Sequence, residues 1–457
     1  MKRRLFAMVM AATMICSSFV PVFAEEAATT VNDVNDPNYV WPDYSGEKLS
    51  IMWWGSDTRH QKTIEVIEKY EELTGLDIEY EYADGSNYWT VFQAKMAGNE
   101  LPDVFQMGNN WATYYDTIEP LNSYIEDGTI DTTNINDTMI ATTTNNANGD
   151  ITGISNGTNA RCFAYNPAIF DECGVAYPTE NWTWDDFAAA CRTITEQTGN
   201  PAITTMEYNN LAYTVITQWK EGYNFYAMDG SGFAFDGDTE PLAYFMNLYN
   251  DLMKEGCIGD WGIQNEIGQN VEADWVAYGD AAMIMLSSNQ FQALSNAAAE
   301  NGIELELCTI PRVKADGQSG MVVRSSQQLS IYSKSEKKDI AANFINYFAN
   351  SIEANKILNC ERGVSINSEV LAALKEDSTL TDANTAKVYD IIDLIGSIED
   401  TKNSSPAEPT ANEEISDVLK KEYAQGLYNG SYENGEEAAE AFWAEAQEIW
   451  AKFEAQE

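Results

Sequence analysis

The stretch LSIMWWGSDTRH at residues 49–60, with the run that continues from it to Gly75, decides the fold of this chain. Leu49 to Trp54 is a short apolar run that stops at Gly55, as a buried strand does. Apolar side chains then recur at the spacing of one helical face, at Ile64, Ile67, Tyr70 and Leu73. Gly75 ends this helix, because a residue without a Cβ adopts the left-handed cap conformation at little cost.

A second strand is predicted directly after this helix. Acidic residues alternate there with the apolar residues Leu76, Ile78, Tyr80 and Tyr82. This two-residue period indicates a half-buried strand, so the unit is β-α-β with parallel strands. Ligands of such sheets bind at the carboxyl ends of the strands. The predicted binding edge carries Trp53, Trp54, Asp57, Arg59 and His60.

The first 24 residues have the organisation of a secretory signal peptide. A basic start at residues 2–4 precedes an apolar stretch to about residue 22, and small residues precede a predicted cleavage after Ala24. We therefore expect export to the periplasm or the extracellular cell surface. Cys16 follows an isoleucine and not a small residue, which disfavours a lipid anchor without excluding one. No later apolar run reaches the about 20 residues of a membrane helix.

Charge and cysteine content limit the partners. The chain has 26 Lys and Arg against 72 Asp and Glu, a formal charge of −46. Such acidity opposes binding to phosphate backbones, so nucleic acid is excluded as a partner. The cysteines at 162, 173, 191, 257, 308 and 360 contain no Cys-x-x-Cys pair, which excludes a disulfide scaffold. A Cys162–Cys173 disulfide and free buried thiols are both compatible with the sequence.

The rest of the chain predicts alternating strands and helices. Residues 25–47 are rich in Ala, Thr, Asn and acidic residues and are predicted to be a flexible leader. Residues 127–159 are rich in Asn, Thr, Asp and Gly, which is typical of a lobe edge or crossover. Further strands are expected at 101–107, 161–165, 279–285 and 303–310, and helices at 88–97, 184 onward, 241–255, 337–358, 413–428 and 436–453.

Six short motifs, taken in order, resemble one protein family. They are WG at 54–55, YEELTG at 70–75, LPDV at 101–104, YNP at 165–167, TWDD at 183–186 and GDAAM at 279–283. Each is weak alone, but their joint order behind a signal peptide resembles the family 1 extracellular solute-binding proteins. These are the maltose-binding-protein-like receptors of carbohydrate ABC importers. The likeness runs from about residue 48 to about residue 370.

The resemblance implies an α/β, two-lobed, periplasmic-binding-protein-like fold with a hinge and an interlobe cleft. We expect an N-terminal lobe from residues 48–157 with 312–363, and a C-terminal lobe from residues 158–311 with 364–457. The resemblance also implies a carbohydrate ligand and the membrane permease subunits of an ABC importer as partners. We expect a monomer with no cofactor and no metal.

Ligand contacts are carried over from the resemblance by position. In the first lobe they fall on Trp54, Asp57, Arg59, Asn109, Asn110 and Trp111. In the second lobe they fall on Asn159, Arg161, Trp219, Ser288 and Asn289, with Arg362 near the last crossover.

The residue types fit a sugar site. A pyranose ring has an apolar face and a rim of hydroxyls, so its site needs flat aromatics beside fixed polar groups. Trp54 and Trp111 stand at predicted strand ends next to such groups, and Trp111 is the expected stacking surface; a tryptophan at a strand end also occurs as a core residue. The absence of a basic cluster favours a neutral oligosaccharide, although Arg59, Arg161 and Arg362 together would suit a uronic acid.

Most enzyme classes conflict with the sequence. The motif GISNG at 153–157 matches a hydrolase nucleophile elbow, but that mechanism needs a histidine after the serine and the single histidine, His60, precedes it. No zinc ligand set and no phosphate-binding loop are present. A secreted glycoside hydrolase remains the alternative, because two carboxylates suffice for that reaction. The favoured hypothesis is a noncatalytic sugar receptor.

Overall fold

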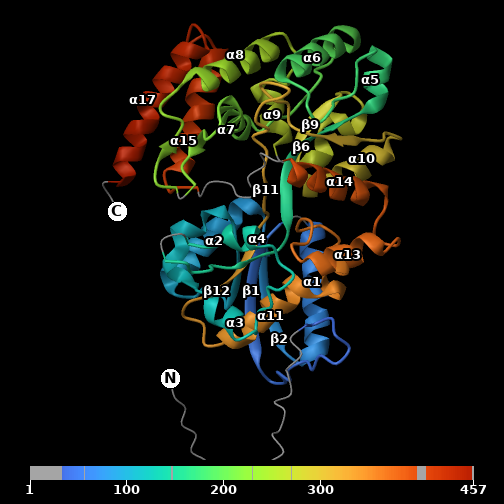
Figure 1. Cartoon of the computed structure of the whole chain (residues 1–457), viewed down its shortest axis with the longest axis vertical. Helices are drawn as coiled ribbons and strands as arrows, with labels where there is room; N and C mark the ends of the chain where they lie inside the picture. The colour runs from blue at the N-terminus through green and yellow to red at the C-terminus, as the bar shows by residue number, and fades with distance from the viewer. Residues whose placement is uncertain are drawn as a thin grey trace, which may run out of the picture.

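The computed structural model describes residues 33–55, 57–145, 148–228, 230–268, 270–398 and 408–454. These residues form two α/β lobes, placed one below the other in Figure 1. The expected two-lobed α/β class is confirmed. Among the described residues, every helix is too short or too polar to cross a membrane. The predicted signal peptide and Cys16 lie outside the described residues.

The first lobe is organised around β1 (Lys48–Trp54), which lies between β2 (Asp77–Ala83) and β3 (Val104–Met107) and pairs in parallel with both. Helix α1 (Asp57–Thr74) connects β1 to β2, and Gly75 ends it with a φ of +71°. The predicted β-α-β unit is therefore confirmed.

Antiparallel strands complete this sheet. Strand β12 (Gln328–Tyr332) pairs with β3, β4 (Ile118–Glu119) and β5 (Ile154–Ser155). The other elements of the lobe are α2 (Gly85–Gly98), η1 (Asn109–Thr117), α3 (Asn122–Glu126), α4 (Asp137–Ala141), α11 (Lys338–Asn350) and α12 (Ile352–Leu358).

Apolar side chains cover both faces of this first sheet. Trp53 belongs to a core with Val66 and Phe344 on one face. Its neighbour Met52 belongs to an aromatic cluster with Tyr88 on the other. Successive residues of a strand point to opposite faces, so this split follows from the pleat of β1.

The second lobe is organised around β6 (Thr158–Tyr165), which pairs antiparallel with β9 (Met283–Ser287), β10 (Glu306–Cys308) and β11 (Val323–Ser325). A separate hydrophobic core surrounds this sheet. The first helices and remaining strands of the second lobe are α5 (Pro167–Cys173), α6 (Trp184–Thr198), α7 (Tyr208–Trp219), β7 (Asn224–Tyr226), β8 (Phe233–Ala234), α8 (Glu240–Lys254), α9 (Trp261–Ile267), η2 (Val271–Ala273) and η3 (Trp275–Tyr278). The later ones are η4 (Ser288–Gln290), α10 (Phe291–Glu300), α14 (Ala383–Ser397), α15 (Asn412–Val418), the π-helix η5 (Leu419–Ala424), α16 (Gln425–Tyr428) and α17 (Gly435–Glu454). Helix α13 (Ser368–Glu376) packs on α12 of the first lobe (Figure 1), while its Val370 and Leu374 belong to the second core.

Three crossover segments, residues 155–158, 325–328 and 362–364, connect the lobes. They are hydrogen-bonded to one another through the backbone: Asn156 N donates to Gln327 O at 2.7 Å, and Thr158 N donates to Val364 O at 2.7 Å. Gly157 allows this close approach, because a Cβ there would lie 2.7 Å from the Arg362 carbonyl oxygen. The crossover segments therefore form one packed unit.

Three expectations about the chain are corrected. The boundary at residue 312 is wrong, because β11 pairs with β6 and Val323 lies in the second core; the chain returns at 325–328. The helix expected over 337–358 is two helices, since Ser351 has extended backbone and its side chain caps α12. Residues 33–47 of the expected flexible leader pack on the first lobe, where the Trp41 and Tyr347 rings lie 5.6 Å apart.

The crowding at Gly157 gives a first testable prediction. Gly157→Ala should lower the free energy of unfolding by about 1–3 kcal/mol, because the added methyl group must displace crossover backbone. The matched control is Gly232→Ala, where a Cβ meets no atom within 4 Å. Chemical denaturation measures both. Equal free energies of unfolding for the two variants would show that the crossover segments accommodate an added methyl group.

Candidate functional site

The carboxyl ends of β1 and β3 lie at the junction of the lobes. Gln106 of β3 accepts a hydrogen bond from the Arg362 guanidinium of the crossover and donates to the Trp54 carbonyl oxygen at 3.2 Å. Trp54 thus stands where the first lobe meets the second. This is the edge at which a parallel sheet presents its ligand-binding groups.

Two half-buried indoles stand at this edge. The Trp54 ring lies 5.5 Å from the ring of Trp89 on α2, and Trp89 is stacked on Tyr114 at 5.4 Å. Both indoles keep part of their surface exposed, whereas Tyr88 beneath them is fully buried. Trp89 was not predicted as a site residue, because within the sequence it looks like any apolar residue of an amphipathic helix.

Trp111 does not have the predicted position. Only 9% of its surface is exposed, and it packs into the aromatic cluster with Phe92, Phe105 and Tyr114. It is a core residue, so the expected stacking surface moves to Trp54 and Trp89. The reason is that η1 follows β3 directly and turns the indole inward.

The remaining first-lobe candidates differ in exposure. Asp57 is exposed at the start of α1, and Asn110 is half-buried beside Gly108. Asn109 begins η1, but its side chain is outside the described part of the chain.

Arg59 and Arg362 are structural and not available to a ligand. Arg362 is 1% exposed, donates to Thr63 Oγ1 at 2.8 Å and lies over the Phe348 ring. Arg59 is 8% exposed and donates to the Glu361 carbonyl oxygen at 3.0 Å. Both guanidinium groups tie the last crossover segment to the first lobe, which corrects their assignment as ligand contacts.

The second lobe presents polar residues from β6 and β11 at the same junction. Asn159 is paired in register with Arg324, and Arg161 lies two residues along β6. Ala160 lies between Asn159 and Arg161 on β6, and Val323 precedes Arg324 on β11; both belong to the second core. Alternation along a strand therefore places Asn159, Arg161 and Arg324 on the face away from that core.

Arg161 is held by acidic and polar neighbours. Its Nη2 lies 2.8 Å from the Glu207 carboxylate, and its Nη1 donates to Ser287 Oγ. Glu207 directly precedes α7. The guanidinium is about one-quarter exposed, so one side of it faces solvent.

Arg324 and Lys420 were not predicted as site residues. Both are half-buried, and within the described residues the side chain of neither forms a hydrogen bond or ion pair. Lys420 lies 5.6 Å from the ring centroid of Trp261. The charge of Arg161, followed by burial, lowers the pKa of Arg324 to about 10. Burial, followed by the charge of Lys421, lowers the pKa of Lys420. No sequence pattern singles them out, because only the paired strands and the π-helix bring them together.

Two further second-lobe candidates adjoin Arg161. Ser288 is fully buried and its Oγ accepts a hydrogen bond from Ala160 N, so it holds β6 in place and does not face a ligand. Asn289 is half-buried in η4, directly after β9.

Trp219 lies apart from the other predicted ligand contacts of the second lobe. It ends α7, about 18 Å along the helix from Glu207 at 1.5 Å per residue. Its ring packs on Tyr244 at 5.6 Å. It lines a hollow of about 490 Å³ with Lys220, Arg312 and Lys314, all from the second lobe.

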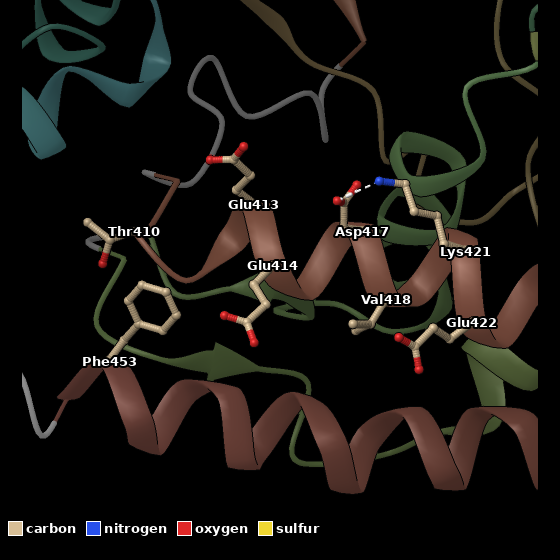
Figure 2. A pocket seen from close by; sticks show the side chains of 8 residues that line it. All are labelled: Thr410, Glu413, Glu414, Asp417, Val418, Lys421, Glu422 and Phe453. Carbon is tan, nitrogen blue, oxygen red and sulfur yellow. Dashed lines mark hydrogen bonds and ion pairs between the residues drawn. The ribbon is translucent and has the colours of Figure 1, made fainter. Parts of the chain in front are cut away.

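A second hollow, of about 480 Å³, lies between α15, η5 and α17. Figure 2 shows its wall of Glu413, Glu414, Asp417 and Glu422, with Phe453 at one end and Lys421 paired to Asp417. Neither hollow contains residues from both lobes. Neither coincides with the indoles of the first lobe or the arginines of the second.

The serine of the nucleophile-elbow motif has a structural role. Ser155 of the GISNG motif donates to the Gly157 carbonyl oxygen and accepts a hydrogen bond from Ser325, so it belongs to the crossover. Within the described residues, the six cysteines are free thiols, and a Cys162–Cys173 disulfide is not formed. Among the same residues, no three His, Cys, Asp or Glu side chains are grouped as a metal ligand set.

Comparison with known proteins identifies the family. The family model of bacterial extracellular solute-binding proteins matches residues 55–354, more than half of the chain. The chain belongs to this family. Its members bind solutes, and the family is extracellular.

Solved structures share the fold over nearly their whole length. A periplasmic solute-binding protein from Pectobacterium atrosepticum is 21% identical, with a TM-score of 0.76 over 89% of this chain and 99% of that chain. A periplasmic oligogalacturonide-binding protein from Yersinia enterocolitica, solved with saturated digalacturonic acid, is 22% identical with a TM-score of 0.75 over 88% and 99%. An ABC substrate-binding protein from Listeria monocytogenes, in complex with cycloalternan, is 17% identical with a TM-score of 0.70 over 89% and 99%. At such identities the likeness shows the fold.

His60 lies beneath the first-lobe edge and generates a pH prediction. Its Nδ1 accepts a hydrogen bond from Trp53 Nε1 at 3.1 Å, and its ring stacks on Tyr82 at 4.1 Å. Burial lowers the pKa of His60 below its ordinary value of 6.5, against an opposing effect of Asp57. The unfolded chain therefore binds this proton more readily, and stability is lost as pH falls through the folded pKa.

We expect wild-type protein to lose more stability than His60→Asn between about pH 7.5 and pH 5, because Asn keeps an acceptor for Trp53 but does not titrate. The carboxylates are common to both proteins, so their contribution cancels in the difference. Urea denaturation of both proteins at both pH values measures this difference in the free energy of unfolding. Parallel pH profiles would contradict a depressed His60 pKa.

Proposed function

We propose that this protein is the substrate-binding receptor of an ABC importer. It captures a sugar or oligosaccharide between its two lobes and delivers the sugar to membrane permease subunits. It is exported and acts without catalysis, cofactor or metal. The observation that carries this proposal is the pair of half-buried indoles, Trp54 and Trp89, at the first-lobe edge of a solute-binding fold.

The chemistry of the two faces supports a sugar. An indole covers the C–H face of a pyranose ring, and amide, carboxylate and guanidinium groups bind its hydroxyls with defined direction. Trp54 and Trp89 supply the first kind of surface. Polar groups stand at the strand ends as well: Asp57 and Asn110 follow β1 and β3, Asn159 lies near the start of β6, and Asn289 follows β9.

Two neighbours of the same fold bind carbohydrates, according to the ligands in their structures: digalacturonic acid and cycloalternan. A screen for this protein therefore includes both acidic and neutral oligosaccharides. Thermal shift and titration calorimetry detect binding. Release of new reducing ends during incubation would favour the secreted glycoside hydrolase instead, and would overturn the receptor proposal.

Trp54→Ala should weaken binding of the best sugar from this screen by roughly five- to hundredfold. This corresponds to losing about 1–3 kcal/mol of apolar contact between indole and sugar. Calorimetry measures the affinity, and thermal melts without ligand measure the stability of the fold.

The matched control is Trp443→Ala. Trp443 is also half-buried, but it lies on α17 against Phe233 and Phe235, at 4.8 Å from each. Its loss should lower the melting temperature and leave affinity unchanged. If the two variants lose affinity equally, or if Trp54→Ala loses none, Trp54 is not a stacking surface.

A further inference from the structure

Arg324 and Lys420 are unusual in a protein of net charge −46. Among the described residues, the other cations of the candidate site are committed: Arg59 to Glu361, Arg161 to Glu207 and Arg362 to Gln106 and Thr63. The side chains of Arg324 and Lys420 form no hydrogen bond or ion pair within the part of the chain that the structure describes. The Lys420 ammonium lies 5.6 Å from the Trp261 ring centroid, whereas the half-buried Arg324 guanidinium loses hydration without gaining a direct partner.

Arg324, Lys420 and Arg161 form one group of cations in the second lobe. Arg324 lies on β11 beside Arg161 on β6, on the sheet face opposite the second core. The charge of Glu207 acts on both Arg324 and Lys420, and the same carboxylate lies 2.8 Å from Arg161 Nη2. Glu408 is the other acidic group that acts on Arg324. Asp417, which is paired with Lys421, acts on Lys420 as well. Arg161, Arg324 and Lys420 thus have one acidic neighbour in common, Glu207.

One buried acceptor stands on the same face. Asn159 is 7% exposed, and within the described residues its Oδ1 has no hydrogen-bond donor. Buried amide oxygens are almost always paired. Within the described residues, the candidate subsite therefore has a guanidinium without an ion pair at Arg324, an ammonium without an ion pair at Lys420, and an unpaired acceptor for a hydroxyl at Asn159.

We propose that Arg324, with Arg161 and Lys420, forms a carboxylate-binding subsite, and that the transported ligand is an acidic oligosaccharide containing uronic acid. This inference rests on the proposed function as a sugar receptor. A carboxylate matches the planar fork of a guanidinium and relieves the repulsion between Arg161 and Arg324. The expectation of a neutral ligand rested on the absence of a basic cluster in the sequence, and folding assembles that cluster from residues far apart.

Oligosaccharides of galacturonic and glucuronic acid, each with its neutral methyl ester, test the inference. The ester keeps the sugar and removes only the charge. We expect the acid to bind at least roughly tenfold more tightly than the ester. Its affinity should fall as salt rises from about 50 to about 500 mM, whereas affinity for the ester should not.

Arg324→Met keeps the length of the side chain and removes the charge. It should reduce affinity for the acid by roughly tenfold or more and leave affinity for the ester unchanged. Without ligand, its melting temperature should stay at or above that of wild type, because Arg324 forms no structural pair and Arg161 loses a repulsive neighbour. Lys420→Met should act in the same direction. The control is Arg192→Met, which removes a charge paired with Glu255 elsewhere on the second lobe and should leave affinity unchanged.

The outcomes separate this inference from the proposed function. Equal affinity for acid and ester, or an unaffected Arg324→Met, overturns the carboxylate subsite and leaves the receptor function standing. If inorganic phosphate binds in the absence of any sugar, the inference that the subsite recognises the carboxylate of a sugar is overturned. Absence of binding to every acidic and neutral sugar overturns both proposals. A large fall in melting temperature for Arg324→Met would show Arg324 to be structural.

Discussion

The hydrogen-bonded unit of three crossover segments is the constraint on which the two-lobed structure depends. Thr158 and Val364 exchange both backbone hydrogen bonds, and Asn156 donates to Gln327, so each segment is bonded to another. Arg362 anchors this unit to the first lobe through Gln106 and Thr63. A buried guanidinium is costly unless it is paired, which makes its partners fixed points of the fold. Because Gln106 also holds the Trp54 backbone, the same anchor positions the first-lobe indoles.

The sequence predicted the parts of this structure that are set by local patterns. The β1-α1-β2 unit follows from periodicity and from Gly75. Strand β11 was missed because three residues carry no period, and so residues 312–325 were assigned to the wrong lobe. The break at Ser351 was missed because the apolar pattern continues across it.

The candidate site was predicted less completely, for a physical reason. Arg161 and Arg362 are indistinguishable in a sequence, yet one is partly exposed and the other is 1% exposed and hydrogen-bonded to Gln106 and Thr63. Trp54 and Trp111 both follow predicted strands, but only Trp54 keeps exposed surface at the junction. Whether a residue binds ligand or fills the core is decided by tertiary packing, which local patterns do not encode.

The two lobes present different chemistry to whatever lies between them. The first lobe offers indoles and an exposed carboxylate, whereas the second offers cations and amides. A ligand with both an apolar ring face and an anionic group gains its full binding energy only when it touches both lobes. Such a ligand binds the closed form more tightly than the open form, and only this difference shifts the equilibrium toward closure. A neutral sugar that uses the indoles alone gains less from the second lobe. Under the proposed function, the charge of Arg324 would link the choice of ligand to closure of the two lobes.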